Sequence, residues 1–150
     1  MEAIKYNPIG IIHSPFKAPD ETPLQTRVSN GARGEIELFS EYMEGLEDLY
    51  KFSHITLIYH FHLAVHPELM VKPTHSDSCH GVFATRAPSR PNSIGISVVR
   101  LIEICGNILH IENIDITDGT PLLDIKPFIP ILERQYATTL GWLADEFDGG

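Results

Sequence analysis

The stretch that decides the fold is IGISVVRLIEICGNILHIENIDI, residues 94–116. It contains two runs rich in β-branched and other apolar side chains, residues 94–105 and 108–116, on either side of Gly106-Asn107. β-Branched residues favour strands, and a Gly-Asn pair between two such runs is typical of a tight hairpin turn. Because both runs are apolar on both faces, we expect two long, central strands paired antiparallel.

Residues 54–65 show the clearest alternation of apolar and polar side chains. All of the odd positions are apolar, whereas the even positions include three histidines and a threonine. A strand with this pattern turns one face to a core and the other to solvent or a site. Shorter runs of similar character predict further strands at residues 9–13, 35–39, 81–85 and 122–125.

Few segments have a helical pattern. Ser40 can cap a short helix that continues to residue 49, and apolar residues at helical spacing predict an amphipathic helix over residues 131–147. Parallel pairing is disfavoured because it needs crossover helices that the chain mostly lacks. The sequence therefore predicts a mainly β protein: a small, mostly antiparallel β-barrel with a short helix and a C-terminal helix, in a single domain over residues 1–150.

The composition limits the possible functions. With 150 residues, of which 43% are hydrophobic and 21% charged, the chain can bury a core, and no apolar run approaches the roughly 18 residues that span a bilayer. The N-terminus lacks the pattern of a secretory signal, so we expect a cytoplasmic protein, with Cys79 and Cys105 as inert thiols. The net charge of −9 disfavours a broad nonspecific nucleic-acid surface, but it permits a local basic site.

Such a local site is suggested by GVFATRAPSRPNSIGIS, residues 81–97. Its two prolines restrict the backbone, and Arg86 and Arg90 supply planar guanidinium donors that match carboxylate and phosphate groups. Residues 72–100 contain four basic side chains and one acidic side chain, which gives a local charge of +3. The stretch is either an anion-binding loop or a proline-rich connection whose arginines are solvated.

Two further groups could carry chemistry. His60, His62 and His66 could hold a metal, but His66 precedes a proline and lies beyond the expected strand, so we expect no metal. DGTPLLDIKP, residues 118–127, combines a strong turn signal at Asp118-Gly119 with carboxylates suited to hydroxyl or ammonium groups. The sequence has no glycine-rich dinucleotide loop, Walker loop, nucleophile elbow or CxxC pair.

Together with IGIIHSPF at residues 9–16, these stretches resemble the TsaA-like family, also called TrmO, of S-adenosylmethionine-dependent tRNA methyltransferases. The resemblance extends to DIKPFIP at residues 124–130, and its most specific parts are residues 81–97 and 118–127. It implies a small β-barrel that forms a homodimer and binds the anticodon loop of tRNA. The implied reaction is methylation of N6 of threonylcarbamoyladenosine, the modified base just 3′ of the anticodon.

The resemblance also implies roles for individual residues. Arg86 would hold the carboxylate of S-adenosylmethionine, Phe61 would lie near its sulfonium or adenine, and Asp118 would bind its ammonium or ribose hydroxyls. No residue is identifiable as the base for the N6 proton. The implied cofactor residues are Pro23, Gln25, Phe61, His62, Arg86, Leu101, Asp118, Gly119, Thr120 and Pro121. The implied candidates for contact with the RNA are Arg90, Asn92 and Lys126.

Three positions depart from the usual pattern of the family. Leu24 stands where the family has the arginine of PRQ, Ser93 replaces the second proline of RPNPIG, and Phe128 replaces the tyrosine of DIKPY. Leu24 and Phe128 bear on RNA affinity or substrate choice more than on cofactor binding. Three alternatives stay open: methylation of another acceptor, a cofactor-binding module without transfer activity, and a metal-binding barrel.

Overall fold

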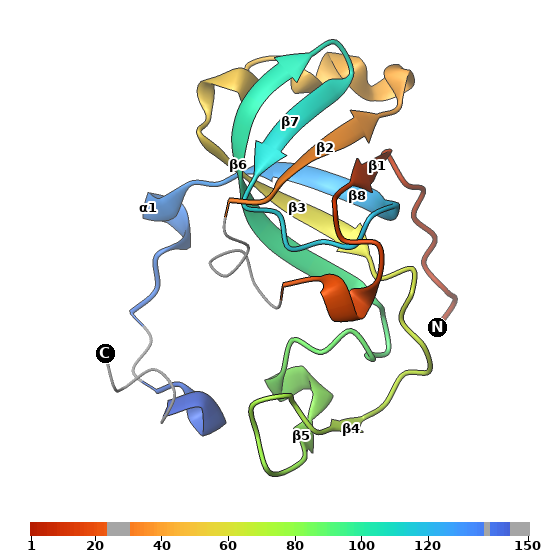
Figure 1. Cartoon of the computed structure of the whole chain (residues 1–150), viewed down its shortest axis with the longest axis vertical. Coiled ribbons are helices and arrows are strands. Elements are labelled where there is room, and N and C mark those ends of the chain that lie inside the picture. Colours follow the sequence, from red (N-terminus) through yellow and green to blue (C-terminus); the bar gives the residue numbers. More distant parts are fainter. Residues whose placement is uncertain (24–30, 137–138, 145–150) are drawn as a thin grey trace.

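The computed structural model describes residues 1–23, 31–136 and 139–144. Its main feature is a closed barrel of six antiparallel strands in the order β1-β2-β7-β6-β3-β8 (Figure 1). This confirms the mainly β class and the antiparallel barrel predicted from the sequence. The barrel strands are β1 (Gly10–His13), β2 (Arg33–Leu38), β3 (His54–His60), β6 (Ile94–Cys105), β7 (Ile108–Glu112) and β8 (Thr120–Pro127).

The other elements are short. Between β3 and β6 the chain leaves the barrel and forms a separate two-stranded sheet of β4 (Met70–Val71) and β5 (His80–Gly81), below the barrel in Figure 1. Within the described ranges, no helix has the length and apolar character needed to cross a membrane. The helical segments are η1 (Pro19–Glu21), η3 (Ser40–Leu46), η4 (Leu49–Lys51), η5 (Val82–Ala84), α1 (Pro130–Glu133) and η6 (Gly141–Leu143).

Aliphatic side chains from all six barrel strands fill the interior. Each fully buried side chain of this kind stabilises the fold by roughly 1.5–3 kcal/mol relative to an exposed one, so the barrel interior is the main source of stability. The buried side chains that pack together there include Ile12, Ile36, Ile55, Leu57, Val99, Leu109 and Leu122.

The β6–β7 hairpin has the predicted position and turn. Cys105 pairs with Ile108 across the turn, in which Gly106 adopts a φ of +64°. However, β7 ends at Glu112 rather than at residue 116, because Asn113 takes a left-handed φ of +67° that interrupts the extended backbone. In contrast to the expectation of two apolar, covered faces, several outward side chains of β6 are exposed: Ile94, Ile96 and Ile102.

β3 ends at His60 rather than at residue 65. The odd side chains up to Tyr59 are buried as predicted, but Leu63 and Val65 are 47% and 78% exposed. The backbone turns at this point, since the amide of Ala64 donates to the carbonyl of Phe61, and the chain then leaves for the β4–β5 sheet. The alternation therefore continues beyond the residues that have a strand partner.

Three other local predictions are corrected. The strand expected at residues 81–85 is the end of β5 followed by the helical turn η5. Phe39, not Ser40, is the N-cap residue of η3, and Asp48, with a φ of +68°, separates η3 from η4. The single helix expected over residues 131–147 does not form: α1 ends at Glu133 because Arg134 returns to extended backbone, and the next helical segment among the described residues is the short turn η6. Residues 137, 138 and 145–147 lie outside the described ranges.

Gly95 provides a test of the packing at one end of the barrel. A Cβ atom there would overlap the Tyr59 ring and lie 2.8 Å from Cζ of Phe61. We therefore expect Gly95→Ala to lower the free energy of unfolding by about 1–3 kcal/mol in urea denaturation. The control is Gly45→Ala, where the added atom has no neighbour within 4 Å. A Gly95→Ala protein as stable as this control would contradict the close packing.

Candidate functional site

One end of the barrel gathers most of the implied cofactor residues. β3 ends there, so Phe61 and His62 follow directly, and β8 begins there with Thr120. Thr120 pairs with Ile12 near the end of β1 and has its hydroxyl oxygen 3.4 Å from Nδ1 of His62. The antiparallel arrangement thus brings three chain segments together at what we call the turn end of the barrel, after the Asp118-Gly119 turn.

The Asp118-Gly119 turn is fixed to the end of β1 by backbone hydrogen bonds. The amide of Gly119 donates to the carbonyl of Ile12 (2.8 Å), and the amide of Asp118 donates to the carbonyl of Phe16 (2.7 Å). Gly119 has a φ of +82°, which a residue with a Cβ adopts only with strain. The turn signal in the sequence is therefore confirmed, and the glycine is required by the backbone itself.

Both carboxylate oxygens of Asp118 already have partners. Oδ1 accepts from the amide of Ser14 (2.9 Å), and Oδ2 accepts from Nζ of Lys17 (2.8 Å). The hydrogen bond from Lys17 is the main cause that lowers the pKa of Asp118, and His13, 3.8 Å away, adds to the effect. A ligand ammonium or hydroxyl that binds Oδ2 would take the place now held by the Lys17 ammonium.

His62 lies against this turn as a neutral imidazole. Burial is the main cause that lowers its pKa, and the proximity of His60 acts in the same direction. The hydroxyl of Thr120 donates to the carbonyl of Thr117 (2.6 Å), so toward His62 it can only accept. Nδ1 of His62 is therefore the protonated nitrogen, which leaves the lone pair of Nε2 beside Gly119.

Phe61 lines the same end with an aromatic ring. Its backbone amide donates to the carbonyl of Ser93 (2.8 Å), which holds the residue at the start of β6. Its ring packs edge-to-face on Tyr59, with centroids 5.5 Å apart and an interplanar angle of 84°. The sequence pattern placed Phe61 on the core face, and the side chain is half-buried at the rim of the core.

A buried hydrogen-bonded chain lies behind Phe61 and was not predicted from the sequence. The hydroxyl of Tyr59 is 2.7 Å from the hydroxyl of Ser97, which donates to Oδ1 of Asp115 (2.6 Å). Burial raises the pKa of Tyr59 to about 12 and also raises the pKa of Asp115. No sequence signal marks this chain, because Tyr59 fits an apolar alternation and Ser97 and Asp115 lie singly among apolar neighbours.

The two arginines of the proline-rich stretch differ in their contacts. Arg86 is exposed, and its positive charge opposes the burial that raises the pKa of Tyr59 and of Asp115, so its guanidinium lies within electrostatic range of both groups. Arg90 is half-buried, and its Nη1 donates to the carbonyls of Thr85 and Ala87 (3.1 and 2.9 Å). Arg90 was expected to contact RNA, but these two hydrogen bonds from its Nη1 stabilise the loop that carries Arg86.

The structure places the other implied cofactor residues unevenly. Pro23 follows Thr22, whose hydroxyl is 2.8 Å from that of Thr117, so Pro23 adjoins the turn. Pro121 is in β8 and pairs with Ile11. Leu101 is not brought to the turn end, because it is a buried core residue of β6, six positions beyond Gly95. Gln25 and Leu24 lie outside the described residues.

The remaining RNA candidates lie at different ends of the barrel. Asn92 is exposed and next to Ser93, close to the backbone of Phe61. Lys126 is six residues along β8 from Thr120, and its Nζ is paired with Oδ2 of Asp124 (2.9 Å). Only Asn92 therefore lies beside the turn end. The metal alternative gains no support either, because the described part of the chain contains no group of three or more potential ligands.

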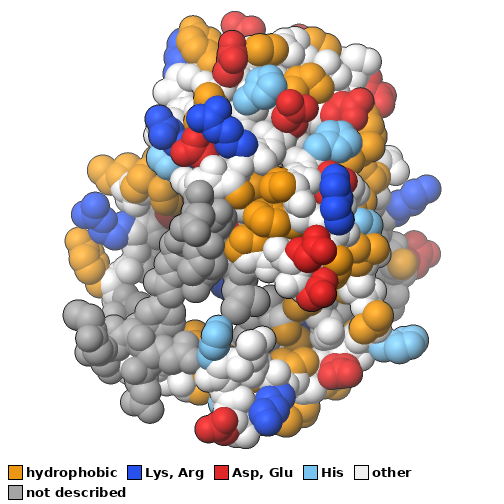
Figure 2. All heavy atoms as spheres, viewed as in Figure 1, with side chains coloured by type: hydrophobic (Ala, Val, Ile, Leu, Met, Phe, Trp, Pro, Cys, Tyr) orange, Lys and Arg blue, Asp and Glu red, His pale blue; other side chains and the backbone are white. Residues whose placement is uncertain are grey.

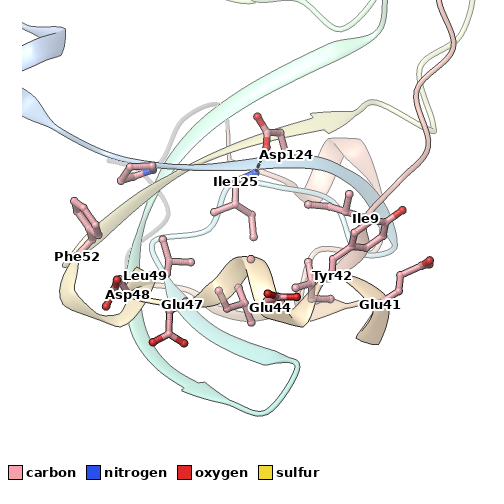
Figure 3. A pocket seen from close by; sticks show the side chains of 14 residues that line it. Ile9, Glu41, Tyr42, Glu44, Glu47, Asp48, Leu49, Phe52, Asp124 and Ile125 are labelled. Carbon is pink, nitrogen blue, oxygen red and sulfur yellow. Dashed lines mark hydrogen bonds between the residues drawn. The ribbon is translucent and has the colours of Figure 1, made fainter.

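A pocket of about 680 Å³ lies at the opposite end of the barrel. It is formed where β2 and β8 end and before β1 begins, beneath η3 and η4, and Figure 3 shows Ile125 pointing into it. Five carboxylates surround its apolar floor, and none of the implied cofactor residues with a described position lines it. Its lining includes Ile9, Leu38, Glu41, Tyr42, Glu44, Glu47, Asp48, Leu49, Phe52, Asp124 and Ile125.

Comparison with known proteins identifies the family of this chain. The model of the tRNA-methyltransferase O N-terminal domain matches residues 11–134, so the chain belongs to this family. A probable S-adenosyl-L-methionine-binding protein of Pyrococcus abyssi is 56% identical over 93% of this chain and 76% of that protein. The tRNA (adenine(37)-N6)-methyltransferase of Escherichia coli is 34% identical over 89% of this chain and 61% of that enzyme.

Solved structures agree with the family assignment. The crystal structure of TrmO from Pseudomonas aeruginosa superposes with a TM-score of 0.78 and 39% identity, over 93% of this chain and 62% of that chain. The present chain thus spans less than two thirds of the length of this solved protein and of the Escherichia coli enzyme. The β-barrel implied by the family resemblance is confirmed.

The Asp118 contacts generate a pH-dependent prediction. Because the pKa of Asp118 is lowered in the folded state, its stabilisation is complete above the unfolded value of about 3.9 and is lost as the pH falls toward the folded value. We expect Asp118→Asn to cost about 1 kcal/mol of unfolding free energy at pH 7 and progressively less below about pH 4. Asp20→Asn, in the exposed turn η1, is the control for urea denaturation at each pH. A cost for Asp118→Asn that does not change with pH would refute the ionic account.

Proposed function

We propose that this chain is an S-adenosylmethionine-dependent methyltransferase that modifies N6 of adenine 37 in tRNA, in the form of threonylcarbamoyladenosine. The observation that carries the proposal is the convergence of Phe61, His62 and the Asp118 turn at one end of the barrel, within electrostatic range of the exposed Arg86. Family membership supports it, as does the 34% identity to an enzyme named tRNA (adenine(37)-N6)-methyltransferase.

The residues at the turn end suit the chemical groups of S-adenosylmethionine. The aromatic ring of Phe61 can contact a sulfonium or an adenine, and the exposed guanidinium of Arg86 can bind a carboxylate. Asp118 offers a carboxylate whose lowered pKa keeps it ionised at neutral pH. This set provides one partner for each charged group of the cofactor.

The mechanism requires mainly alignment and the removal of one proton. When bound, S-adenosylmethionine supplies a methyl group already activated by a positively charged sulfur. The barrel residues orient donor and acceptor and keep water away from them. A ureido nitrogen holds its lone pair in conjugation, so loss of the N6 proton assists its attack. Nε2 of neutral His62 is a proton acceptor that the turn end presents, since Nδ1 donates to Thr120.

The charge distribution is compatible with an RNA substrate despite the net charge of −9. Residues 72–100, which include Arg86 and Asn92 near the turn end, carry a net charge of +3. On the face shown in Figure 2, basic, acidic and histidine side chains are interspersed in the upper part. Such a surface is better suited to binding one anticodon loop than to binding along a nucleic-acid duplex. A tRNA substrate would place the enzyme in the cytoplasm.

The activity is tested by mass spectrometry of tRNA nucleosides. Incubation of threonylcarbamoylated tRNA with the protein and S-adenosylmethionine should add one methyl group to N6 of that nucleoside. Arg86→Ala should lower kcat/KM by about tenfold or more, because a charged hydrogen bond to the cofactor is lost. Arg100→Ala, which removes an exposed arginine of β6 paired with Glu112, should leave the rate within twofold.

Two outcomes would contradict the proposal. Calorimetry that detects no binding of S-adenosylmethionine would exclude cofactor-dependent transfer. Cofactor binding without methylation of this tRNA would leave a non-catalytic module, or an enzyme for another acceptor. A screen of unmodified tRNA and other nucleophiles then separates these two alternatives.

We also propose that the protein is a homodimer. The exposed isoleucines of β6, with Ile94 and Ile96 44% and 53% exposed, provide apolar surface that a second copy would cover. Light scattering should then give a mass of about twice 16.8 kDa. Ile94→Ser together with Ile96→Ser should weaken the dimer, whereas Ile131→Ser, at an exposed position of α1, should not. A monomeric wild-type protein would contradict this assignment.

A further inference from the structure

The hydrogen-bonded chain of Tyr59, Ser97 and Asp115 has a fixed direction. Tyr59 and Ser97 are each only 5% exposed, so neither hydroxyl can rely on bulk water. Ser97 has a single hydroxyl hydrogen and donates it to Oδ1 of Asp115, so it must accept from Tyr59. The Tyr59 hydroxyl therefore donates to Ser97, Ser97 donates to Asp115, and the chain ends on a carboxylate.

This chain connects β3, β6 and the segment that precedes the Asp118-Gly119 turn. Tyr59 is two residues before Phe61 in β3, Ser97 is in β6 opposite Leu57, and Asp115 is three residues before Asp118. A change at any of its links would alter the relative position of the cofactor-facing residues. The exposed guanidinium of Arg86 lies near enough to influence both titratable members of the chain.

The Tyr59 ring is the direct support of Phe61. The two rings pack edge-to-face, and Gly95 lies so close to both that an added Cβ would overlap the Tyr59 ring and crowd Phe61. The hydrogen bond from the Tyr59 hydroxyl to Ser97 holds the hydroxyl end of the Tyr59 ring in place. Since Phe61 is only half-buried, the orientation of its exposed part depends on the ring behind it.

The barrel core could be filled without the polar side chains of this hydrogen-bonded chain. The rest of the interior is almost entirely aliphatic, and a phenylalanine at position 59 would fill the same space without a buried hydroxyl. Burying the Tyr59 and Ser97 hydroxyls beside the half-buried Asp115 carboxylate costs desolvation free energy that a connected network recovers but seldom exceeds. A buried network of this kind gains most by specifying one geometry.

We propose that Asp115, through Ser97 and Tyr59, is a positioning residue that orients Phe61 toward the methyl donor. This inference rests on the proposed function, because Phe61 has an active role only if the turn end binds S-adenosylmethionine. It assigns a role to Tyr59, Ser97 and Asp115, for which the sequence and the family resemblance gave none.

Three variants test the role of the chain. Tyr59→Phe removes one oxygen atom, Ser97→Ala breaks the middle link, and Ser97→Thr keeps a hydroxyl at that link. We expect Tyr59→Phe and Ser97→Ala to weaken binding of S-adenosylmethionine by about tenfold in calorimetry, with partial rescue in Ser97→Thr. The control is Thr56→Val in the same strand, because the buried hydroxyl of Thr56 has no partner among the described residues.

Kinetics distinguish positioning from simple support of the fold. We expect KM for S-adenosylmethionine to rise by about tenfold in Tyr59→Phe while KM for tRNA stays within twofold. A fall in the melting temperature with both KM values unchanged would overturn the inference, because the chain would then act on stability alone. If Ser97→Ala does not fold, Tyr59→Phe still decides the question, because it removes only the hydroxyl oxygen.

The outcome for the wild-type protein separates the two proposals. Wild-type binding with undiminished binding by Tyr59→Phe and Ser97→Ala would overturn the positioning role and leave the proposed function intact. No binding by the wild-type protein would overturn the proposed function, and the positioning role with it. Weakened binding confined to the chain variants, with Thr56→Val normal, is the result that supports both.

Discussion

The hydrogen bonds between the end of β1 and the Asp118-Gly119 turn are the constraint on which the rest of the structure depends. They place the start of β8 against β1, and this pairing closes the barrel. Closure removes the strand edges that would otherwise bind other chains. The same bonds hold Asp118, Gly119 and Thr120 beside His62, so the interaction that completes the fold also assembles the candidate site.

The sequence predicted those parts of the fold in which local pattern and tertiary pairing agree. The β6–β7 hairpin was predictable because its apolar runs and its Gly-Asn turn act within one short stretch. The end of β3 was not predictable, since Leu63 and Val65 continue the alternation but are exposed beyond His60, the last β3 residue that pairs with β6. The single helix predicted over residues 131–147 was wrong for a similar reason: Leu132 and Tyr136 have helical spacing, yet both are exposed in the described part of the chain.

Only those site residues that belong to recognisable sequence motifs could be predicted. The turn from Asp118 and the pair Phe61-His62 were named from the sequence, and the structure brings them together. The contacts of Lys17 with Asp118 and of Tyr59 with Ser97 were not predicted. Single polar or aromatic residues that are far apart in the chain give no sequence signal of such contacts. Conversely, Arg90 was an RNA candidate implied by the family resemblance, whereas its Nη1 donates to two loop carbonyls, a contact that the sequence does not reveal.

The acidity of the protein is divided between the two ends of the barrel. Glu41, Glu44, Glu47 and Asp48 all lie around the pocket beneath η3 and η4, far along the strands from the turn end. At the turn end, the carboxylates of Asp115 and Asp118 are each engaged by a hydrogen bond, to Ser97 and Lys17 respectively. The carboxylates around the pocket disfavour the approach of a polyanion to that end, whereas the exposed charge of Arg86 favours it at the turn end. Since potentials of this kind steer charged ligands before contact, an uneven distribution of charge makes the net value of −9 compatible with a local site for a polyanion.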